Sequence, residues 1–384
     1  MSKKKAELED SLASSIASDV NKQFKGQNYK SAFFLDGDAD SPTKVSSWVK
    51  SGFDMLDLAI SNKPQGGFPV GKITEVTGLE ATGKSLLVAH ALAETQKAGG
   101  LAVYIDTESA TSAEFLQAIG VDLKAMIYIP MQTVEEIFET IDVIVKKVRD
   151  TDKDRVVTIV VDSIMGASTK IEMEKEFDKD GYATAKSIIL SKAMRKVTNE
   201  IAREKICLIL TNQLRVRLGV AFGDPYTTSG GKAIPFHASV RLRLKNLGKI
   251  KAKVNGKEQV VGVKTKVIVV KNRLGPPHRE LEYEIYFDSG IDNYGGWLHV
   301  MKDFNLVTKS GNSYVYIDID PSTAEVLGEY KFMSKDFVEK VINFPDVKAR
   351  LHERICNEYI FKYKANEDGG IDDVVIDEDM VSEE

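Results

Sequence analysis

A glycine-rich segment at residues 78–85 carries the clearest chemistry in this sequence. It reads Gly-Leu-Glu-Ala-Thr-Gly-Lys-Ser and matches the pattern GxxxxGK[ST], between the strand-like run Ile73–Thr77 and the helix-like run Leu86–Leu92. Glycines permit a tight loop whose backbone N–H groups converge on phosphate oxygens, and the helix N-terminus adds a favourable dipole. The flanking strand and helix favour a nucleotide site over a chance glycine-rich turn. The predicted nucleotide-binding residues are Gly78, Leu79, Glu80, Ala81, Thr82, Gly83, Lys84 and Ser85.

Three side chains near this loop are typical of phosphoryl-transfer chemistry. We expect Lys84 to reach the β- and γ-phosphates and the Ser85 hydroxyl to ligate Mg²⁺. Asp162 ends the apolar run Val156–Asp162. Mg²⁺ keeps several waters and needs only one or two protein ligands, so we predict that Asp162 holds the water shell of the metal. A carboxylate at a strand end also caps helices, but the neighbouring phosphate loop favours the metal role.

Hydrolysis needs a group that polarises the attacking water. Glu108 lies just beyond the end of the strand-like run Leu101–Asp106. Open parallel sheets bind ligands at the C-terminal edge of their strands, which places Glu108 near the reacting phosphate. Asp106 is a competitor, because its side chain shares the face of Glu108 if the strand continues. Spacing alone does not decide between the two carboxylates.

Strand-like and helix-like runs alternate over about residues 45–290. This order is typical of right-handed βαβ units, so we predict an α/β fold with a mostly parallel twisted sheet flanked by helices. The predicted strands are Ile73–Thr77, Leu101–Asp106, Met126–Ile129, Val156–Asp162, Ile206–Thr211, Val240–Leu244, Val267–Val270 and Tyr283–Phe287. The predicted helices are Ser85–Lys97, Ser112–Ile119, Thr133–Val148 and Ala185–Glu204. The last three strands lack intervening helices, which predicts an antiparallel extension.

The segment before this core, residues 1–44, has its own pattern. Apolar residues at four-residue spacing predict a helix over residues 6–25. A polar, turn-rich linker follows, interrupted by the apolar run Ala32–Leu35. This short strand either pairs within its own core or extends the sheet of a neighbouring subunit.

Beyond residue 290 the pattern changes twice. Residues 291–364 predict a small C-terminal α/β domain, with strand-like pieces over 313–331. Its predicted helices are Ser334–Asn343, capped by Ser334, and Val347–Lys362. Residues 365–384 carry nine acidic and no basic residues, so we predict a disordered acidic tail.

Composition excludes several classes of protein. The longest apolar runs are strand-sized, so no membrane span is expected, and no apolar segment follows the basic N-terminus as in a secretory signal. Two cysteines form no disulfide framework, and five histidines without paired spacing argue against structural zinc. These features predict a cytoplasmic protein.

Charge is distributed unevenly. The net charge of the chain is −5. The acidic tail contributes −9, so the rest of the chain has a net charge of +4. Residues 230–273 hold twelve Lys and Arg and one acid, Glu258. A Lys/Arg-rich stretch is usually a solvated sheet face, and the motifs above make a polyanion partner the better interpretation.

Several motifs together resemble the RecA recombinase family. They are Gly78–Ser85, Tyr104–Glu108, Val160–Ser163, Thr211–Gln213, Gly219–Gly231, Phe236–Arg241 and Val269–Arg273. The resemblance covers about residues 45–300 in order, and Gly219–Gly231 is more specific than a phosphate loop. It implies a RecA-like ATPase core, a polymerisation arm made of the N-terminal helix and strand, and ATP and Mg²⁺ as cofactors. Departures from typical bacterial members leave a phage origin open.

The resemblance also assigns catalytic roles. Glu108 matches the catalytic glutamate, and Gln213 matches the glutamine that senses the γ-phosphate at the root of a DNA-binding loop. Lys271 and Arg273 match two cations that reach the γ-phosphate bound by the neighbouring subunit. Phe115 falls where the family stacks an aromatic ring on adenine, although an apolar helix residue is equally suited to the core. The family lysine before Phe236 is replaced by Pro235, which cannot supply that charge.

The two DNA loops of the family map to about residues 172–184 and 214–232. In the second loop, arginine and glycine N–H groups bind phosphate without reading bases, and apolar Leu218 and Val220 are expected to wedge between stacked bases. The predicted DNA-binding residues are Arg195, Arg215, Arg217, Leu218, Gly219, Val220, Gly230 and Gly231.

The leading functional hypothesis is a DNA-dependent ATPase that forms helical homo-oligomers on single-stranded DNA and exchanges it with double-stranded DNA. Single-strand-binding and loader proteins are further expected partners. A hexameric helicase with a RecA-like core is an alternative that Gly219–Gly231 disfavours. A DNA-coating scaffold with negligible catalysis is a third hypothesis, which Glu108 and the two trans cations disfavour.

Overall fold

The computed structural model describes residues 2–25, 30–34, 41, 43–174, 182–216, 226–228 and 231–362. They belong to two compact units, Met1–Ser46 and Ser47–Glu384. The first unit consists mainly of α1 (Ser2–Gln23). At its end, Oδ1 of Asn21 accepts the N–H groups of Ser31 and Ala32 at 2.8 and 2.9 Å, which folds the chain back against the helix. Residues 31–34 form no strand here, so the expected strand Ala32–Leu35 remains a prediction for an assembled state, and Leu35 lies outside the described residues.

A mixed sheet forms the centre of the second unit, in the order β12-β11-β10-β9-β3-β7-β6-β4-β5, with β8 paired to β7. Every pairing from β9 to β5 is parallel, and β9 to β12 pair antiparallel. The parallel core and its antiparallel extension are therefore confirmed. The strands are β3 (Ile73–Gly78), β4 (Leu101–Asp106), β5 (Met126–Pro130), β6 (Val157–Asp162), β7 (Ile206–Val216), β8 (Tyr226–Thr228), β9 (Val240–Val254), β10 (Lys257–Asn272), β11 (Glu280–Tyr286) and β12 (Gly290–Ile291).

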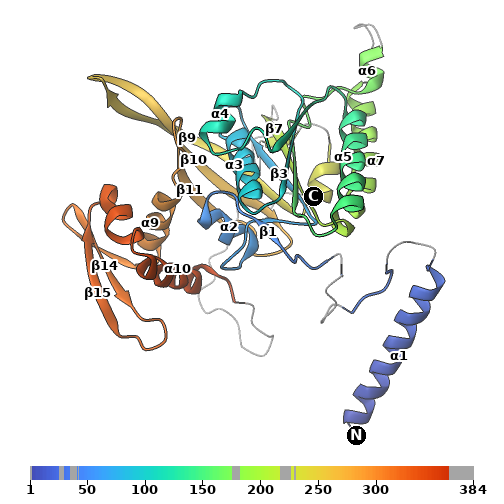
Figure 1. The fold of residues 1–384 in the computed structure, drawn as a ribbon, viewed down its shortest axis with the longest axis horizontal. Helices are drawn as coiled ribbons and strands as arrows, with labels where there is room; N and C mark the ends of the chain where they lie inside the picture. Colours follow the sequence, from blue (N-terminus) through green and yellow to red (C-terminus); the bar gives the residue numbers. More distant parts are fainter. Residues whose placement is uncertain are drawn as a thin grey trace. The chain divides into compact units, whose positions relative to one another are not determined.

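Helices cover both faces of this sheet (Figure 1). Apolar residues of α3 and α4 pack in one core, and those of α5 and α7 pack in a second core. The α5 helix begins with a capping box, in which the Thr133 hydroxyl and the Glu136 carboxylate bond each other's backbone N–H groups. The bounds are α3 (Lys84–Lys97), α4 (Ala113–Ala118), α5 (Val134–Thr151) and α7 (Tyr182–Arg203), within a few residues of the predicted helices.

Strands β9 and β10 continue far beyond the predicted lengths and form a two-stranded ribbon that projects from the sheet (Figure 1). The pairing runs from Val240 opposite Asn272 to Val254 opposite Lys257. The two residues between them, Asn255 and Gly256, have φ of 52° and 78°. Asn-Gly is a favoured two-residue hairpin turn, so the sequence did contain the signal for this ribbon.

The C-terminal part contains a three-stranded antiparallel sheet and further helices. Its apolar residues join the core around α3. The indole N–H of Trp297 donates to Asp54 of α2 at 3.1 Å, which links α9 to α2. These elements are α2 (Asp54–Ser61), α9 (Asn293–Asp303), β13 (Val307–Ser310), β14 (Ser313–Ile319), β15 (Val326–Phe332) and α10 (Pro345–Tyr359).

The predicted helix Ser334–Asn343 is wrong in type. The chain forms a short 3₁₀ turn at Ser334–Asp336 and a wider π-type turn at Val338–Ile342. Met333 precedes the first turn, so the Ser334 hydroxyl is not in the capping position. No helix among the described residues is long and apolar enough to span a membrane.

Candidate nucleotide and DNA site

The loop between β3 and α3 is tightly wound. Gly83 has φ of 90°, in the region that favours glycine, and it precedes α3 without any side-chain cap. A Cβ at Gly78 would lie 2.5 Å from Oγ1 of Thr82 and 2.9 Å from the carbonyl oxygen of Leu244. The glycines are thus required by the packing of the loop. The helix N-terminus, uncapped by a side chain, suits an anion such as a phosphate group.

Lys84 extends across this loop. Its ammonium donates to the carbonyl oxygens of Gly78 at 3.1 Å and Leu79 at 2.8 Å. Burial lowers the pKa of Lys84, and the charges of Asp162, Glu108 and Glu80 act to raise it. The cation and the helix N-terminus together fit a polyphosphate.

Asp162 ends β6, and hydroxyl groups from the two adjacent strands hold its carboxylate. The Tyr104 hydroxyl of β4 donates to Oδ2 at 2.7 Å, and the Thr211 hydroxyl of β7 donates to Oδ1. Burial, and secondarily the Asp162 charge, raises the pKa of Tyr104, which keeps the phenol a proton donor. These two hydrogen bonds therefore fix the orientation of the Asp162 carboxylate. Sequence reasoning missed Tyr104 and Thr211, since only strand pairing brings them to Asp162.

Asp106 and Glu108 have different surroundings. Asp106 is buried, and its carboxylate accepts the N–H groups of Glu108 and Ser109 at 2.9 and 2.8 Å. It also accepts the Tyr128 hydroxyl at 3.0 Å. Through these hydrogen bonds, Asp106 stabilises the loop after β4. The side chain of Glu108, in contrast, is exposed. Glu108 is thus the more accessible of the two carboxylates between which spacing left the choice open.

The loop after β6 packs directly against Glu108. The Ser163 hydroxyl donates to Oε1 of Glu108 at 2.9 Å and accepts the N–H of Gly166 at 3.1 Å. A Cβ at Gly166 would lie 2.5 Å from Oγ1 of Thr107 and 2.9 Å from Cγ of Glu108. Ser163 therefore orients the carboxylate, and Gly166 leaves room for it. In the sequence, Ser163 was identified only as the last residue of the motif Val160–Ser163.

Of the three further predicted catalytic residues, Gln213 lies on β7, Lys271 lies near the end of β10, and Arg273 directly follows β10. Gln213 lies opposite Gly78 in the β3–β7 pairing, at the start of the phosphate loop. Lys271 donates to the carbonyl oxygens of Pro235 and Phe236 at 2.7 and 3.1 Å, and Arg273 donates to Phe236 at 3.4 Å. Both cations thus lie against the C-terminal end of α8 (Ala233–His237), where Pro235 contributes its carbonyl group.

The predicted adenine contact, Phe115, is partly buried against the core around α3. Its N–H donates to the Ser112 hydroxyl at 3.0 Å, which caps α4. This packing agrees with the interpretation of Phe115 as a core residue. Stacking of its ring on adenine remains a prediction.

The predicted DNA residues are only partly covered by the described chain. Arg195 on α7 and Arg215 on β7 are exposed, and Gly231 has φ of 77°. β8 pairs with β7 and gives the second expected loop a strand that the sequence did not predict. In the first expected loop, α6 (Lys170–Glu174) is helical. Arg217, Leu218, Gly219, Val220 and Gly230 lie outside the described residues.

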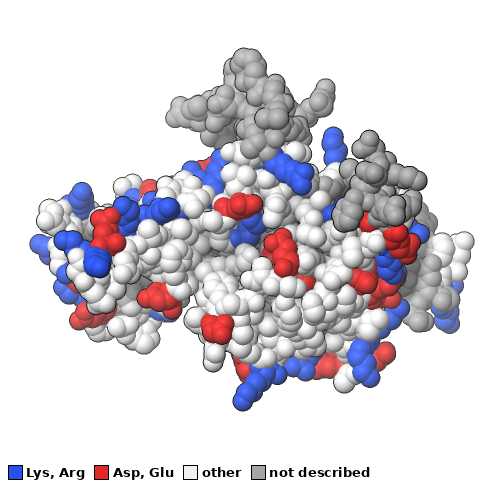
Figure 2. All heavy atoms as spheres, turned by 90° about the horizontal axis from the view of Figure 1, so that it is seen from above, with Lys and Arg blue, Asp and Glu red and all other residues white. Residues whose placement is uncertain are grey.

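The basic stretch 230–273 is partly neutralised. Lys251 pairs with Glu258 at 2.7 Å, Lys264 with Glu282 at 2.6 Å and Lys266 with Glu280 at 2.5 Å. On the face drawn in Figure 2, basic and acidic side chains are interspersed over the described surface. We therefore expect DNA phosphates to be bound by local clusters of Lys and Arg rather than by the overall charge of this stretch.

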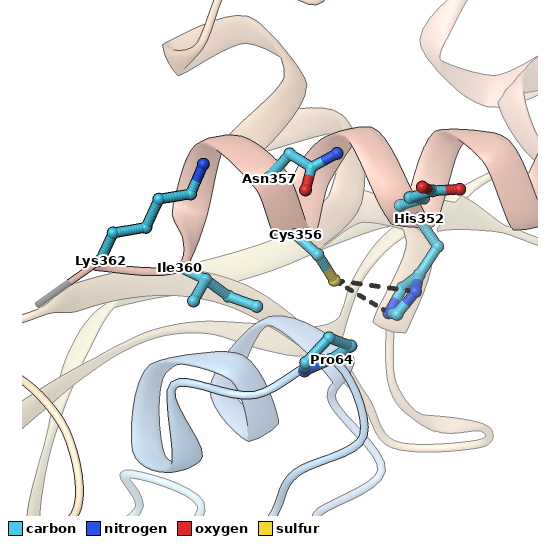
Figure 3. Close-up of a pocket in the computed structure, with 7 residues that line it drawn as sticks. Pro64, His352, Cys356, Asn357, Ile360 and Lys362 are labelled. Atoms are coloured by element: carbon cyan, nitrogen blue, oxygen red, sulfur yellow. Dashed lines mark hydrogen bonds between the residues drawn. The ribbon is translucent and has the colours of Figure 1, made fainter. Parts of the chain in front are cut away.

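A separate cavity of about 340 Å³ lies between Pro64 and α10 (Figure 3). Cys356 lines it, with Sγ 3.8 Å from both ring nitrogens of His352. Burial raises the pKa of the Cys356 thiol to about 11, so the thiol stays protonated at neutral pH and is a poor nucleophile. Among the described residues no group of three or more His, Cys, Asp or Glu could hold a metal ion by itself.

A family model for the RecA N-terminal domain matches residues 12–292. Protein RecA of Cereibacter sphaeroides is 35% identical over 337 residues, covering 88% of this chain and 92% of the relative. The same-named protein of Leifsonia xyli is 34% identical over 351 residues (91% and 90%), and that of Paracoccus denitrificans 32% over 368 residues (96% and 95%).

The chain belongs to the RecA family. It is therefore an ATP-dependent DNA recombinase with a RecA-like core, and it acts in DNA recombination and repair. Nucleotide binding, DNA binding and filament formation follow from membership of the RecA family. The helicase and scaffold alternatives are not favoured.

Proposed function

We propose that the chain hydrolyses ATP with Mg²⁺ at the edge where β3, β4, β6 and β7 end, and uses it to pair and exchange homologous DNA strands. One observation carries the proposal: Glu108 is the exposed carboxylate of the loop after β4, and Ser163 orients it by a 2.9 Å hydrogen bond. The charge of Glu108 acts to raise the pKa of Lys84, which supports a shared site for the two residues.

In this site Lys84 and the N-terminus of α3 bind the phosphates, and Ser85 and Asp162 hold the metal, Asp162 through water. The metal supplies charge neutralisation at the β- and γ-phosphate oxygens. Glu108 accepts a proton from the attacking water, and Asp106 keeps the loop of Glu108 in place. Phe115 is proposed to contact the adenine ring.

Gln213 is proposed to report the γ-phosphate to the DNA-binding segment. It lies opposite Gly78 and three residues before the end of β7, where the second expected DNA loop begins. A neutral amide can donate to a phosphate oxygen and release it after hydrolysis. Movement of the amide then shifts the segment that carries Arg215 and, beyond the described residues, Arg217.

Lys271 and Arg273 are proposed to complete the nucleotide site of a neighbouring subunit. Burial lowers the pKa of His237, and the charges of Arg195, Arg273 and Lys271 lower it further. Four basic groups therefore gather around the end of α8. A concentration of like charges is stabilised by an anion. The γ-phosphate of a nucleotide bound by the next subunit would be such an anion. Cations supplied by a neighbouring subunit stabilise the charge of the transition state.

Exposed apolar groups support a helical filament. On α1, Leu12 and Ile16 are 63% and 56% exposed. The edge strand β5 exposes Ile127 and Tyr128, and Phe236 is 68% exposed. An unpaired strand edge is a template for an incoming strand, which fits the apolar run Ala32–Leu35 of another subunit.

Single-stranded DNA is the proposed scaffold of the filament and double-stranded DNA the exchange partner. Arg195, Arg215 and Gly231 are the described members of the proposed contact set, and contacts to phosphate make binding independent of sequence. Single-strand-binding and loader proteins are proposed as further partners, and the cytoplasm as the compartment.

Electron microscopy with single-stranded DNA and a non-hydrolysable ATP analogue tests the proposal. An open helical filament is expected. A closed ring would instead support a hexameric helicase, and a filament whose subunits do not hydrolyse ATP would support a coating scaffold.

A further inference from the structure

Lys186, in the second turn of α7, contacts the loop that follows β6. Its ammonium donates to the carbonyl oxygen of Met165 at 3.1 Å and to that of Ala167. Burial lowers the pKa of Lys186, and the neighbouring Glu172 raises it. A half-buried lysine that binds two backbone carbonyls fixes the loop to which they belong.

That loop, residues 163–168, is the one that orients Glu108. Ser163 begins it and donates to Oε1 of Glu108, and the N–H of Gly166 donates to the Ser163 hydroxyl. Met165 and Ala167 flank Gly166 in the chain. A change in the position of the Lys186 ammonium therefore changes the support of the Ser163 hydroxyl and, through it, of the Glu108 carboxylate.

Lys186 also lies where both expected DNA segments begin or end. Glu172, on α6 at the start of the first segment, and Arg215, at the start of the second, both act on the charge of Lys186. A Cβ at Gly231, at the end of the second segment, would lie 3.4 Å from Oγ of Ser187, the residue after Lys186. Glu172, Arg215 and Gly231, which lie at ends of the expected DNA segments, are thus all near the first turns of α7.

We propose that Lys186 is a positioning residue that couples both DNA-binding segments to the orientation of Glu108. The inference rests on the proposed DNA-dependent ATPase function. When DNA occupies the segments, the first turns of α7 shift, and Lys186 carries this shift to residues 163–168. The ammonium acts on backbone carbonyls and does not itself neutralise a DNA phosphate.

Lys186→Met removes the donors and retains most of the side-chain packing. Lys192→Met is the matched control, since Lys192 is exposed on the same helix. ATP turnover of the full chain is measured with and without oligo(dT) single strands. We expect DNA-stimulated kcat of Lys186→Met to fall about tenfold, the scale of losing hydrogen bonds from a charged group. DNA-free turnover and the KM for ATP stay within about threefold of the native protein.

Two further measurements separate positioning from a direct DNA contact or a folding defect. The slope of log affinity for oligo(dT) against log salt stays unchanged in Lys186→Met; a slope reduced by about 0.7 would show that Lys186 neutralises a phosphate and would overturn the inference. Hydrogen exchange of residues 163–168 changes on DNA binding in the native protein and in Lys192→Met, but not in Lys186→Met. Lys186→Arg, which keeps donors and charge, restores part of the stimulation.

Equal DNA stimulation in Lys186→Met and the native protein overturns the inference and leaves the proposed function intact. Absence of DNA stimulation in the native protein overturns the proposed function itself, and the inference with it. Loss of DNA-free turnover together with stimulation in Lys186→Met would show a general structural role and would also overturn the inference.

Discussion

Gln213 lies opposite Gly78 in the parallel pairing of β7 with β3. The residue at the root of the proposed second DNA-binding segment is therefore next to the first residue of the phosphate loop. Gln213→Glu keeps the size of the side chain but places an anion beside the phosphates, so the ATP-dependent increase in DNA affinity is expected to disappear. Affinity for oligo(dT) with ADP and with a non-hydrolysable ATP analogue measures this. An undiminished ratio of the two affinities would remove Gln213 from the coupling.

Glu108→Gln retains the shape of the side chain and loses the base. ATP binding and filament formation are expected to persist, while hydrolysis falls by about 10²–10⁴. Glu114→Gln is a suitable control, because Glu114 is a solvent-exposed carboxylate on the following helix, α4. Turnover of Glu108→Gln within about threefold of the native rate would exclude Glu108 as the base.

Tyr104→Phe removes the hydroxyl that donates to Asp162 and leaves the ring in place. Hydrogen bonds to charged groups contribute about 1.5–3 kcal/mol, so the concentration of Mg²⁺ needed for nucleotide binding is expected to rise about tenfold or more. Nucleotide binding titrated with Mg²⁺ measures the effect without requiring turnover. Tyr128→Phe, which loses a bond to Asp106 instead, should leave the Mg²⁺ requirement near the native value.

Lys271→Ala combined with Arg273→Ala should leave ATP bound but not hydrolysed, because each nucleotide site is proposed to be completed by its neighbour. Mixing this protein with Lys84→Ala protein restores some interfaces in which an intact phosphate loop meets intact cations. Partial recovery of ATPase activity in the mixture is the expected result. Subunit exchange measured by fluorescence confirms co-assembly, and no recovery in co-assembled filaments would disprove the trans assignment.

The pH dependence of the reaction is expected to reflect Lys271. Burial, with Arg273 and Arg241 nearby and Glu75 opposing them, lowers the pKa of Lys271 to about 8. The cation is thus present below this pH and is lost as pH rises through about 8, so hydrolysis should fall on the alkaline side. Lys271→Arg keeps its charge to higher pH. A pH–rate profile in which the alkaline limb does not move in Lys271→Arg would assign that limb to another group.

The sequence was sufficient for the mostly parallel core and for the glycine-rich loop between β3 and α3, because glycine spacing and apolar runs are local features. It was insufficient for the supports of the site. Tyr104, Thr211 and Lys186 act through strand pairing and loop contacts between residues distant in the chain, which no local pattern encodes. The residues alone left the choice between Asp106 and Glu108 open, because it depends on the hydrogen bonds that Asp106 makes in the folded chain.

Other errors have local causes. The ribbon of β9 and β10 was predicted too short because only the buried inner parts of the two strands were recognised, whereas their outer residues are exposed. The segment after Met333 resembled an ordinary helix because turns of different pitch use similar apolar spacing. The segment boundaries at residues 44, 290 and 364 remain predictions.

The projecting ribbon also has a practical use. Its turn is open, with nothing within 4 Å of a Cβ built at Gly256, and the two native thiols, Cys207 and Cys356, are buried and have raised pKa values. Lys257→Cys would therefore create a single fast-reacting thiol for a maleimide fluorophore. Each subunit would carry one dye on its ribbon, and energy transfer between successive dyes would follow assembly in real time.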